Sequence, residues 1–118
     1  MSRILPDCPV ATALTVLNNS WKALIIRDLQ GGSKRFGELK NSVGSISPNM
    51  LTNSLRDLES DGLVIRTVYA EIPPRVEYTL TSLGMSFTPI ISALGKSGFG
   101  YKKNQEEKIS DTTDVRGN

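Results

Sequence analysis

Four polar side chains that can hydrogen-bond to the edges of DNA bases recur at spacings of three and four in the middle of the chain. They are Asn49, Thr52, Asn53 and Arg56. Residues at this spacing share one face of a helix. Asparagine pairs with adenine and arginine with guanine through two hydrogen bonds, and threonine offers a hydroxyl and a methyl group. The pattern predicts a helix face that reads bases in the major groove.

An alternative interpretation is that this face is polar only because it is solvated. A solvated helix of this length usually carries glutamate and lysine, which have higher helix propensities than asparagine and threonine. The residue types therefore favour base reading for the group as a whole.

Three basic residues are candidates for contacts with DNA phosphates. Lys34 and Arg35 stand before a predicted helix, and Arg75 follows the loop between two predicted strands. Phosphate contacts position a protein on DNA without reading its sequence. Each residue could equally be an ordinary surface charge, and Glu71 partly offsets Arg75.

The composition excludes several classes of enzyme, because the chain has no histidine and one cysteine, Cys8. A Ser-His-Asp triad, a Cys-His pair, a 2-His-1-carboxylate iron site, a Cys/His zinc cluster and an internal disulfide cannot form. The sequence also contains no GxGxxG or Walker-type phosphate loop. We therefore expect no catalysis, no metal and no cofactor.

The bulk properties fit one soluble domain of 118 residues, of which 38% are apolar. No apolar run approaches the roughly 18 to 20 residues of a membrane-spanning helix, and residues 1–7 lack the layout of a signal peptide. We expect a cytoplasmic protein with no membrane partner. The net charge of +2 is only mildly basic, so any case for DNA binding depends on where the charges lie.

Apolar periodicity predicts four helices in the first half of the chain. They cover about residues 8–17, 20–30, 36–43 and 47–61. The fourth is the best delimited, with Ser47 as N-cap and Pro48 in the first helical position. Leu51, Leu55 and Leu58 form its buried stripe.

Two runs rich in β-branched and aromatic residues, within 64–80, predict a β-hairpin with Pro73 and Pro74 in its loop. A last helix follows Thr81, and we expect Pro89 to kink or restart it. The polar residues from 102 onward predict a disordered tail. The expected organisation is a domain over 1–101 and a tail over 102–118.

This order of elements predicts an α+β, mostly α fold, a winged helix-turn-helix. The short glycine-containing connection before the fourth helix is where the motif needs its turn. The fourth helix, about 47–61, would then lie in the major groove, and the hairpin, about 64–80, would be a wing on the backbone or minor groove.

The terminal helices carry more apolar surface than a small domain covers alone, and a two-fold homodimer would bury it. Core packing within one chain is the alternative for part of this set. The candidate interface residues are Val10, Leu14, Phe87, Ile90, Ile91 and Leu94.

Five segments in order resemble the HxlR-type regulators, which are bacterial winged-helix relatives of the MarR group. They are CPVATAL, SWKALIIRDL, KRFGELK, ISPNMLTNSLRDLESDGLV and EIPPRVEYTLTSLG, within about residues 8–97. The resemblance implies a homodimer, held by its first and last helices, on a partly palindromic operator in double-stranded DNA. The half-sites should lie about one helical turn, roughly 34 Å, apart. Members often have glycines where this chain has Asn18, Asn19 and Ser20.

The resemblance also makes Cys8 a candidate sensor. A cysteine beside the proline is typical of the family, and in some members it looks like the sensor of oxidants or electrophiles. The start of a helix would stabilise its thiolate. The alternative is a small buried hydrophobe at the dimer interface, and a small-molecule effector is a further option.

We therefore expect a homodimeric, sequence-specific transcriptional regulator that binds DNA. The main alternative is a winged-helix module for protein–protein interaction, in which alanine at the four polar positions of the fourth helix leaves any DNA binding unchanged. An enzyme is the third class, and the absence of histidine opposes it.

Overall fold

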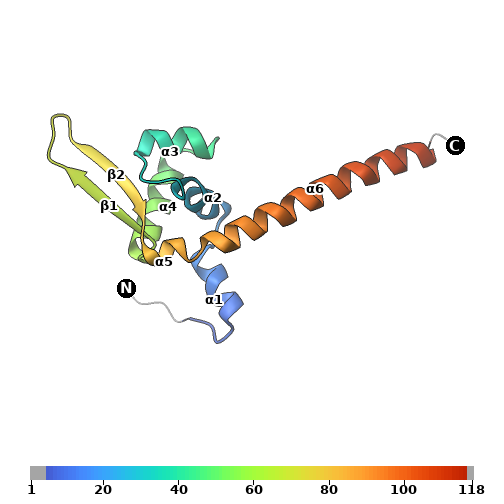
Figure 1. Cartoon of the computed structure of the whole chain (residues 1–118), viewed down its shortest axis with the longest axis horizontal. Helices are drawn as coiled ribbons and strands as arrows, with labels where there is room; N and C mark the ends of the chain where they lie inside the picture. The colour runs from blue at the N-terminus through green and yellow to red at the C-terminus, as the bar shows by residue number, and fades with distance from the viewer. Residues whose placement is uncertain (1–4, 117–118) are drawn as a thin grey trace. The chain divides into compact units, whose positions relative to one another are not determined.

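A computed structural model describes the backbone of residues 5–116 and the side chains of residues 5–109. Within this range six helices accompany one antiparallel hairpin (Figure 1). The elements are α1 (Pro9–Val16), α2 (Ser20–Leu29), α3 (Phe36–Val43), α4 (Pro48–Ser60), β1 (Val64–Tyr69), β2 (Arg75–Leu80), α5 (Ser82–Met85) and α6 (Thr88–Arg116). The mostly helical fold with a two-stranded wing is confirmed. None of the described helices is both long and apolar enough to cross a membrane.

The chain divides into two compact units, residues 1–88 and 89–118. The first unit holds every element from α1 to α5, and the second consists of α6. Thr81 caps α5 by accepting a hydrogen bond from the Gly84 amide at 3.0 Å. Since α5 ends at Met85 and α6 begins at Thr88, Pro89 restarts the helix as predicted.

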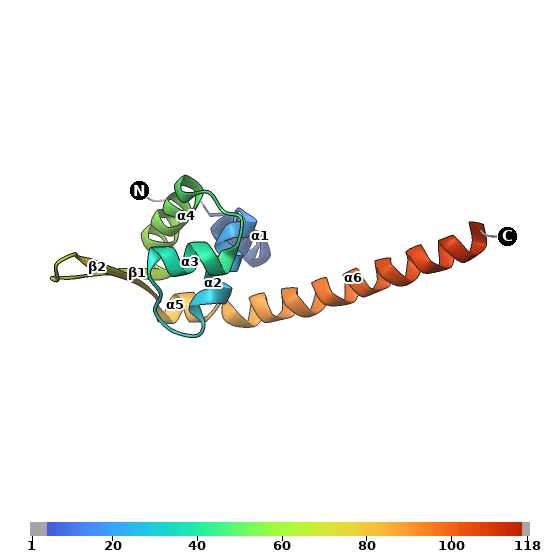
Figure 2. The same ribbon diagram turned by 90° about the horizontal axis from the view of Figure 1, so that it is seen from above.

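The core of the first unit lies among α2, α3, α4 and the base of the hairpin. Among its most deeply buried apolar side chains are Ile25, Ile26, Leu39, Leu51, Leu55, Leu58, Leu63 and Val64. The stripe predicted for α4 is therefore confirmed, and Met50 lies at its edge, 40% exposed. Figure 2 shows the hairpin extending beyond these helices.

The hairpin pairs six residues of each strand, from Val64 opposite Leu80 to Tyr69 opposite Arg75. A further bridge joins its base to the segment before α3. The Lys34 amide donates to the Tyr78 carbonyl at 3.0 Å, and the Tyr78 amide donates to the Lys34 carbonyl at 2.8 Å. These two bonds tie the wing to the helix-turn-helix.

The structure differs from the expected disordered tail, because α6 continues through the polar segment as far as Arg116. Residues 102–108, KKNQEEK, are mostly good helix formers. Lys102 and Lys103 precede Glu106 and Glu107 by four residues, a spacing that supports an exposed helix. Disorder was expected because the segment can bury little surface, but helix propensity and the spacing of opposite charges favour a helix here. Residues 117–118 lie outside the described part.

Candidate nucleic-acid interface

A tight turn sets the direction in which α4 leaves α3. Gly44 ends α3 with a φ of 110°, a left-handed conformation that favours glycine. Ile46 is buried in the turn, and Ser47 caps α4 by accepting a hydrogen bond from the Met50 amide at 3.1 Å. Pro48 occupies the first turn of α4, as predicted. The turn and cap hold the N-terminal end of α4 at the surface.

The polar face predicted for α4 lies opposite its buried stripe. Asn49, Asn53 and Arg56 are exposed and Thr52 is half-buried. Within residues 5–109, none of these four side chains takes part in a hydrogen bond or ion pair. Their donors and acceptors are therefore free to bind a ligand.

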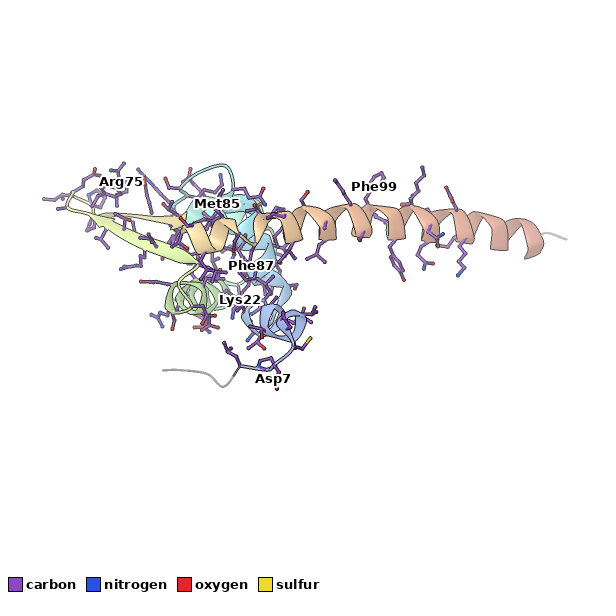
Figure 3. All side chains as sticks on the ribbon, turned by 60° about the horizontal axis from the view of Figure 1, so that its bottom comes forward. Asp7, Lys22, Arg75, Met85, Phe87 and Phe99 are labelled. Atoms are coloured by element: carbon purple, nitrogen blue, oxygen red, sulfur yellow. The ribbon has the colours of Figure 1, made fainter. Side chains whose placement is uncertain are left out.

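Lys22, a buried lysine that the sequence analysis did not identify, connects α2 to α4 through an ion pair. Lys22 of α2, which is labelled in Figure 3, is 1% exposed. Its ammonium donates to Asn18 Oδ1 at 2.8 Å and lies 3.1 Å from Asp57 Oδ2. The sequence does contain a signal for this burial. Ile25, Ile26 and Leu29 follow Lys22 at helical spacing and place it on the buried stripe of α2.

Lys34 and Arg35 lie immediately before α3, as predicted. Lys34 is half-buried, with its backbone in the bridge to the wing, whereas Arg35 is exposed. The Arg35 amide donates to Glu38 Oε1 at 2.8 Å and so caps α3. The structure does not test whether either side chain contacts phosphate.

Arg75 is held within the wing, which weakens its candidacy as a phosphate contact. Its guanidinium lies 4.0 Å from the centre of the Tyr69 ring and forms salt bridges to Glu71 at 3.3 Å and Glu77 at 3.6 Å. Two carboxylates offset its charge, so Arg75 braces the hairpin.

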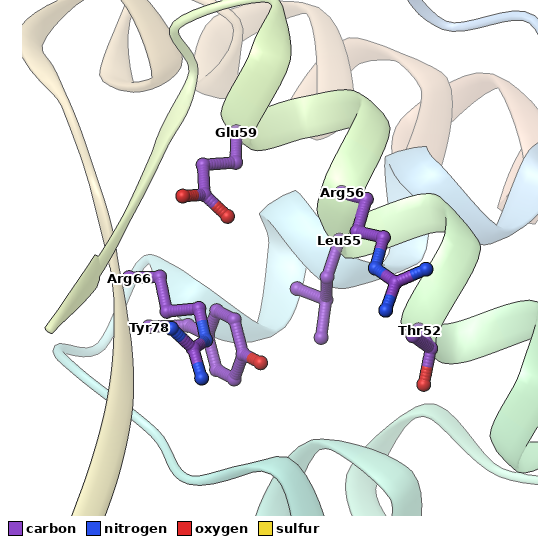
Figure 4. A pocket seen from close by; sticks show the side chains of 6 residues that line it. All are labelled: Thr52, Leu55, Arg56, Glu59, Arg66 and Tyr78. Atoms are coloured by element: carbon purple, nitrogen blue, oxygen red, sulfur yellow. The ribbon is translucent and has the colours of Figure 1, made fainter. Parts of the chain in front are cut away.

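A pocket of about 450 Å³ lies between α4 and the wing. Its lining residues are Thr52, Leu55, Arg56, Glu59, Arg66 and Tyr78 (Figure 4). Sequence reasoning missed Arg66, an exposed residue of β1 that pairs with Tyr78 across the hairpin. Alternation along β1 places Arg66 on the same side as the buried Val64, and this pattern could have found it.

The candidate dimer residues differ in exposure within the single chain. Val10 and Leu14 of α1 are 68% and 63% exposed, and Ile90 and Leu94 of α6 are 41% and 55% exposed. Phe87 is half-buried, and Ile91 is 9% exposed. The first four are the side chains that a partner could cover.

Cys8 is the N-cap residue of α1, and it is exposed in the single chain. The alternative of a buried small hydrophobe therefore requires a partner subunit to cover it.

Comparison with known proteins agrees with this geometry. Residues 16–106 match the model of a family described as HxlR-like helix-turn-helix. An HTH-type transcriptional regulator of Methanothermobacter thermautotrophicus is 44% identical over 99 residues, which cover 84% of this chain and 76% of the relative. A transcriptional regulator of the MarR family from Porphyromonas gingivalis W83 superposes with a TM-score of 0.77 at 37% identity, covering 84% of this chain and 97% of that one.

The redox regulator HypR, solved in an oxidised and a reduced form, is also similar. Its reduced form superposes with a TM-score of 0.79 at 38% identity, covering 85% of this chain and 99% of that one.

Proposed function

Since this chain belongs to the HxlR-like helix-turn-helix family and is a transcriptional regulator, we propose that it binds a specific operator in double-stranded DNA as a homodimer. In this proposal α4 enters the major groove, and Asn49, Thr52, Asn53 and Arg56 contact base edges. Ser47, at the start of the same helix, lies in the groove, and Lys34 and Arg35 contact nearby phosphates. The protein acts in the cytoplasm and catalyses no reaction.

The observation that carries this proposal is the state of the α4 face. Side chains that can distinguish adenine and guanine project from a helix whose other face is buried and whose start is capped. They are not engaged by other residues of the described chain. A protein-interaction module would not require these residue types at these positions.

Dimerisation is supported by apolar side chains that one chain leaves exposed on α1 and α6. Val10, Leu14, Ile90 and Leu94 are each more than 40% exposed. A two-fold interface buries the same residues on both subunits. Two copies of α4 would then contact a partly palindromic operator, with half-sites roughly 34 Å apart.

Selection of bound sequences from random duplex DNA tests the proposal directly. We expect enrichment of a partly palindromic site, which Arg56→Ala and Asn53→Ala bind about 1 to 3 kcal/mol more weakly in a titration. Ser60→Ala, at the far end of the same helix, is the matched control and should bind like wild type. If no sequence is enriched at low salt, the protein-interaction alternative takes first place.

The oligomeric state is tested by light scattering on the eluted protein. Leu14→Glu or Leu94→Glu should reduce the mass to that of one chain. The control, Ile72→Glu, places the same charge at a fully exposed apolar position of the hairpin loop and should leave the dimer intact. A wild-type mass of one chain at micromolar concentration would contradict the homodimer.

A second proposal concerns regulation by oxidants or electrophiles through Cys8. Its support is the exposure of this thiol at the start of α1 together with the similarity to HypR, which is named a redox regulator. Since the chain has one cysteine, oxidation must yield a sulfenic acid, a mixed disulfide or a disulfide between subunits.

A further inference from the structure

We infer that the pocket between α4 and the wing binds one backbone phosphodiester of the operator, and that Arg66 is its principal contact. This inference rests on the proposed function, because it requires α4 to enter DNA. It moves the wing's main phosphate contact from Arg75, the residue expected from sequence, to a residue on the other strand of the hairpin.

The pocket brings hydrogen-bond donors from three elements, α4, β1 and β2, to one space of about 450 Å³. Arg56 and Thr52 come from α4, and Arg66 and Tyr78 come from the paired strands (Figure 4). The Tyr78 hydroxyl points into this space. Guanidinium groups bind phosphate oxygens through paired hydrogen bonds, and hydroxyl groups add single ones.

The charge of the pocket fits a phosphodiester. Two guanidinium groups, from Arg56 and Arg66, face one carboxylate, Glu59. The balance is one positive charge, which matches the single negative charge of a backbone linkage. Glu59 also disfavours a second anionic group in the same space.

Among the described residues, both arginines lack a carboxylate partner, in contrast to the other arginine of the hairpin. Arg66 can bind the anion directly, and Arg56, which is proposed to contact a base edge, adds positive charge beside it. Within residues 5–109, neither Arg56 nor Arg66 forms a salt bridge, whereas Arg75 forms two. In this part of the chain the positive charge of Arg66 is therefore not offset by a salt bridge, whereas Glu71 and Glu77 offset the charge of Arg75.

The position of the pocket agrees with the proposed docking. Thr52 and Arg56 belong both to the pocket and to the exposed face of α4. A phosphate held beside them lies on the backbone that borders the groove entered by α4. The wing then clamps this backbone from the side opposite to the helix.

The test compares Arg66→Gln with Arg27→Gln, which removes the same charge from α2, outside the pocket. Binding of the selected operator and of a random duplex is measured over a range of salt concentrations. We expect Arg66→Gln to weaken both complexes roughly tenfold or more. The slope of log K against log salt should fall by about two, because each subunit of the dimer loses one phosphate contact, with the ratio of specific to non-specific affinity unchanged.

A second arm uses operators in which single phosphodiesters are replaced by uncharged methylphosphonates. One replacement in each half-site should weaken wild-type binding as much as Arg66→Gln does, and should leave the affinity of that variant unchanged. This coupling identifies the linkage that Arg66 contacts. Titration of the free protein with inorganic phosphate, followed by the NMR signals of β1, should give only weak binding.

The outcomes separate the two proposals. Specific operator binding by wild type with an unchanged salt slope in Arg66→Gln overturns the inference and leaves the function intact. Equal losses in Arg66→Gln and Arg27→Gln also overturn it. Tight binding of inorganic phosphate that competes with DNA would assign the pocket to a free anion instead. Absence of any sequence-specific binding by wild type contradicts the proposed function itself.

Discussion

The ammonium of Lys22 lies 3.1 Å from the carboxylate of Asp57, and this pair connects α2 to the helix that carries the proposed base contacts. Lys22 is 1% exposed, whereas the Asp57 side chain is 60% exposed. Asp57 adjoins Arg56 in α4. The pair therefore fixes α4 against the body of the first unit directly behind the residues that are proposed to read DNA.

Removing the carboxylate leaves a buried ammonium with Asn18 as its remaining partner. We expect Asp57→Ala to lower the free energy of unfolding by about 1 to 2 kcal/mol, because an unpaired buried charge is costly and the exposed partner is screened by water. Lys22→Met should cost less, since it removes the charge and keeps the apolar stem. Urea unfolding measures both, and the double variant should resemble Lys22→Met. Equal stability of Asp57→Ala and wild type would contradict the role of the pair.

Gly84 allows α5 to pack against the base of the hairpin. A Cβ atom at this position would overlap the backbone carbonyl oxygen of Leu63 and lie 3.0 Å from Leu80 Cδ2. A backbone atom cannot move aside as a side chain does. We therefore expect Gly84→Ala to destabilise the protein by about 1 to 3 kcal/mol in thermal or urea unfolding.

The matched control for Gly84 is Gly37 in α3. A Cβ there meets no atom within 4 Å, and alanine is the better helix former. Gly37→Ala should therefore raise the free energy of unfolding by about 0.5 to 1 kcal/mol. If both substitutions had the same sign, close packing at Gly84 would not be the cause.

The α2–α3 contact makes stability depend on acid pH through Asp28. Burial raises the pKa of this carboxyl, but hydrogen bonds from Arg27 at 2.7 Å and Ser42 at 2.8 Å, with the charges of Arg27 and Lys34, outweigh burial and lower the pKa. A lowered folded-state pKa contributes stability above the unfolded value of about 3.9, and this contribution is lost as pH falls through the folded value. Asp28→Asn should therefore flatten the loss of stability below about pH 4 in urea unfolding. A curve parallel to wild type would exclude Asp28 as the cause.

Local signals predicted most of the fold. Gly44 ends α3, and Ser47 and Pro48 begin α4, through caps and backbone preferences that act within a few residues. The apolar stripes follow helical periodicity. The polar face of α4 could be predicted for the same reason, because a single helix sets it.

Contacts between elements could not be predicted in this way. The partner of Lys22 lies 35 positions further along the chain, and the pocket of Arg66 requires α4 and both strands. Arg75 was correctly placed after the loop, yet its guanidinium is held by Glu77 and the Tyr69 ring as well as by Glu71. The helix in the polar C-terminal segment depends on helix propensity, which burial alone does not predict.

Cys8 provides the last prediction, which concerns the proposed response to oxidants. Peroxide converts a thiolate to a sulfenic acid and is itself reduced to water, and condensation with the thiol of a second subunit gives a disulfide with loss of another water. Either product changes the group at the start of α1, where Val10 and Leu14 belong to the proposed interface. We expect peroxide to change operator affinity of wild type roughly 5- to 150-fold, the usual range for coupled sites.

The Cys8→Ser protein should not respond to peroxide, although it keeps full operator affinity, since serine is a favourable N-cap residue. Non-reducing electrophoresis then distinguishes the products, because a disulfide between subunits doubles the mass and a sulfenic acid does not. Equal responses of wild type and Cys8→Ser would remove Cys8 from the mechanism. In that case the exposed thiol at the N-cap of α1 would be explained by coverage within the dimer rather than by sensing.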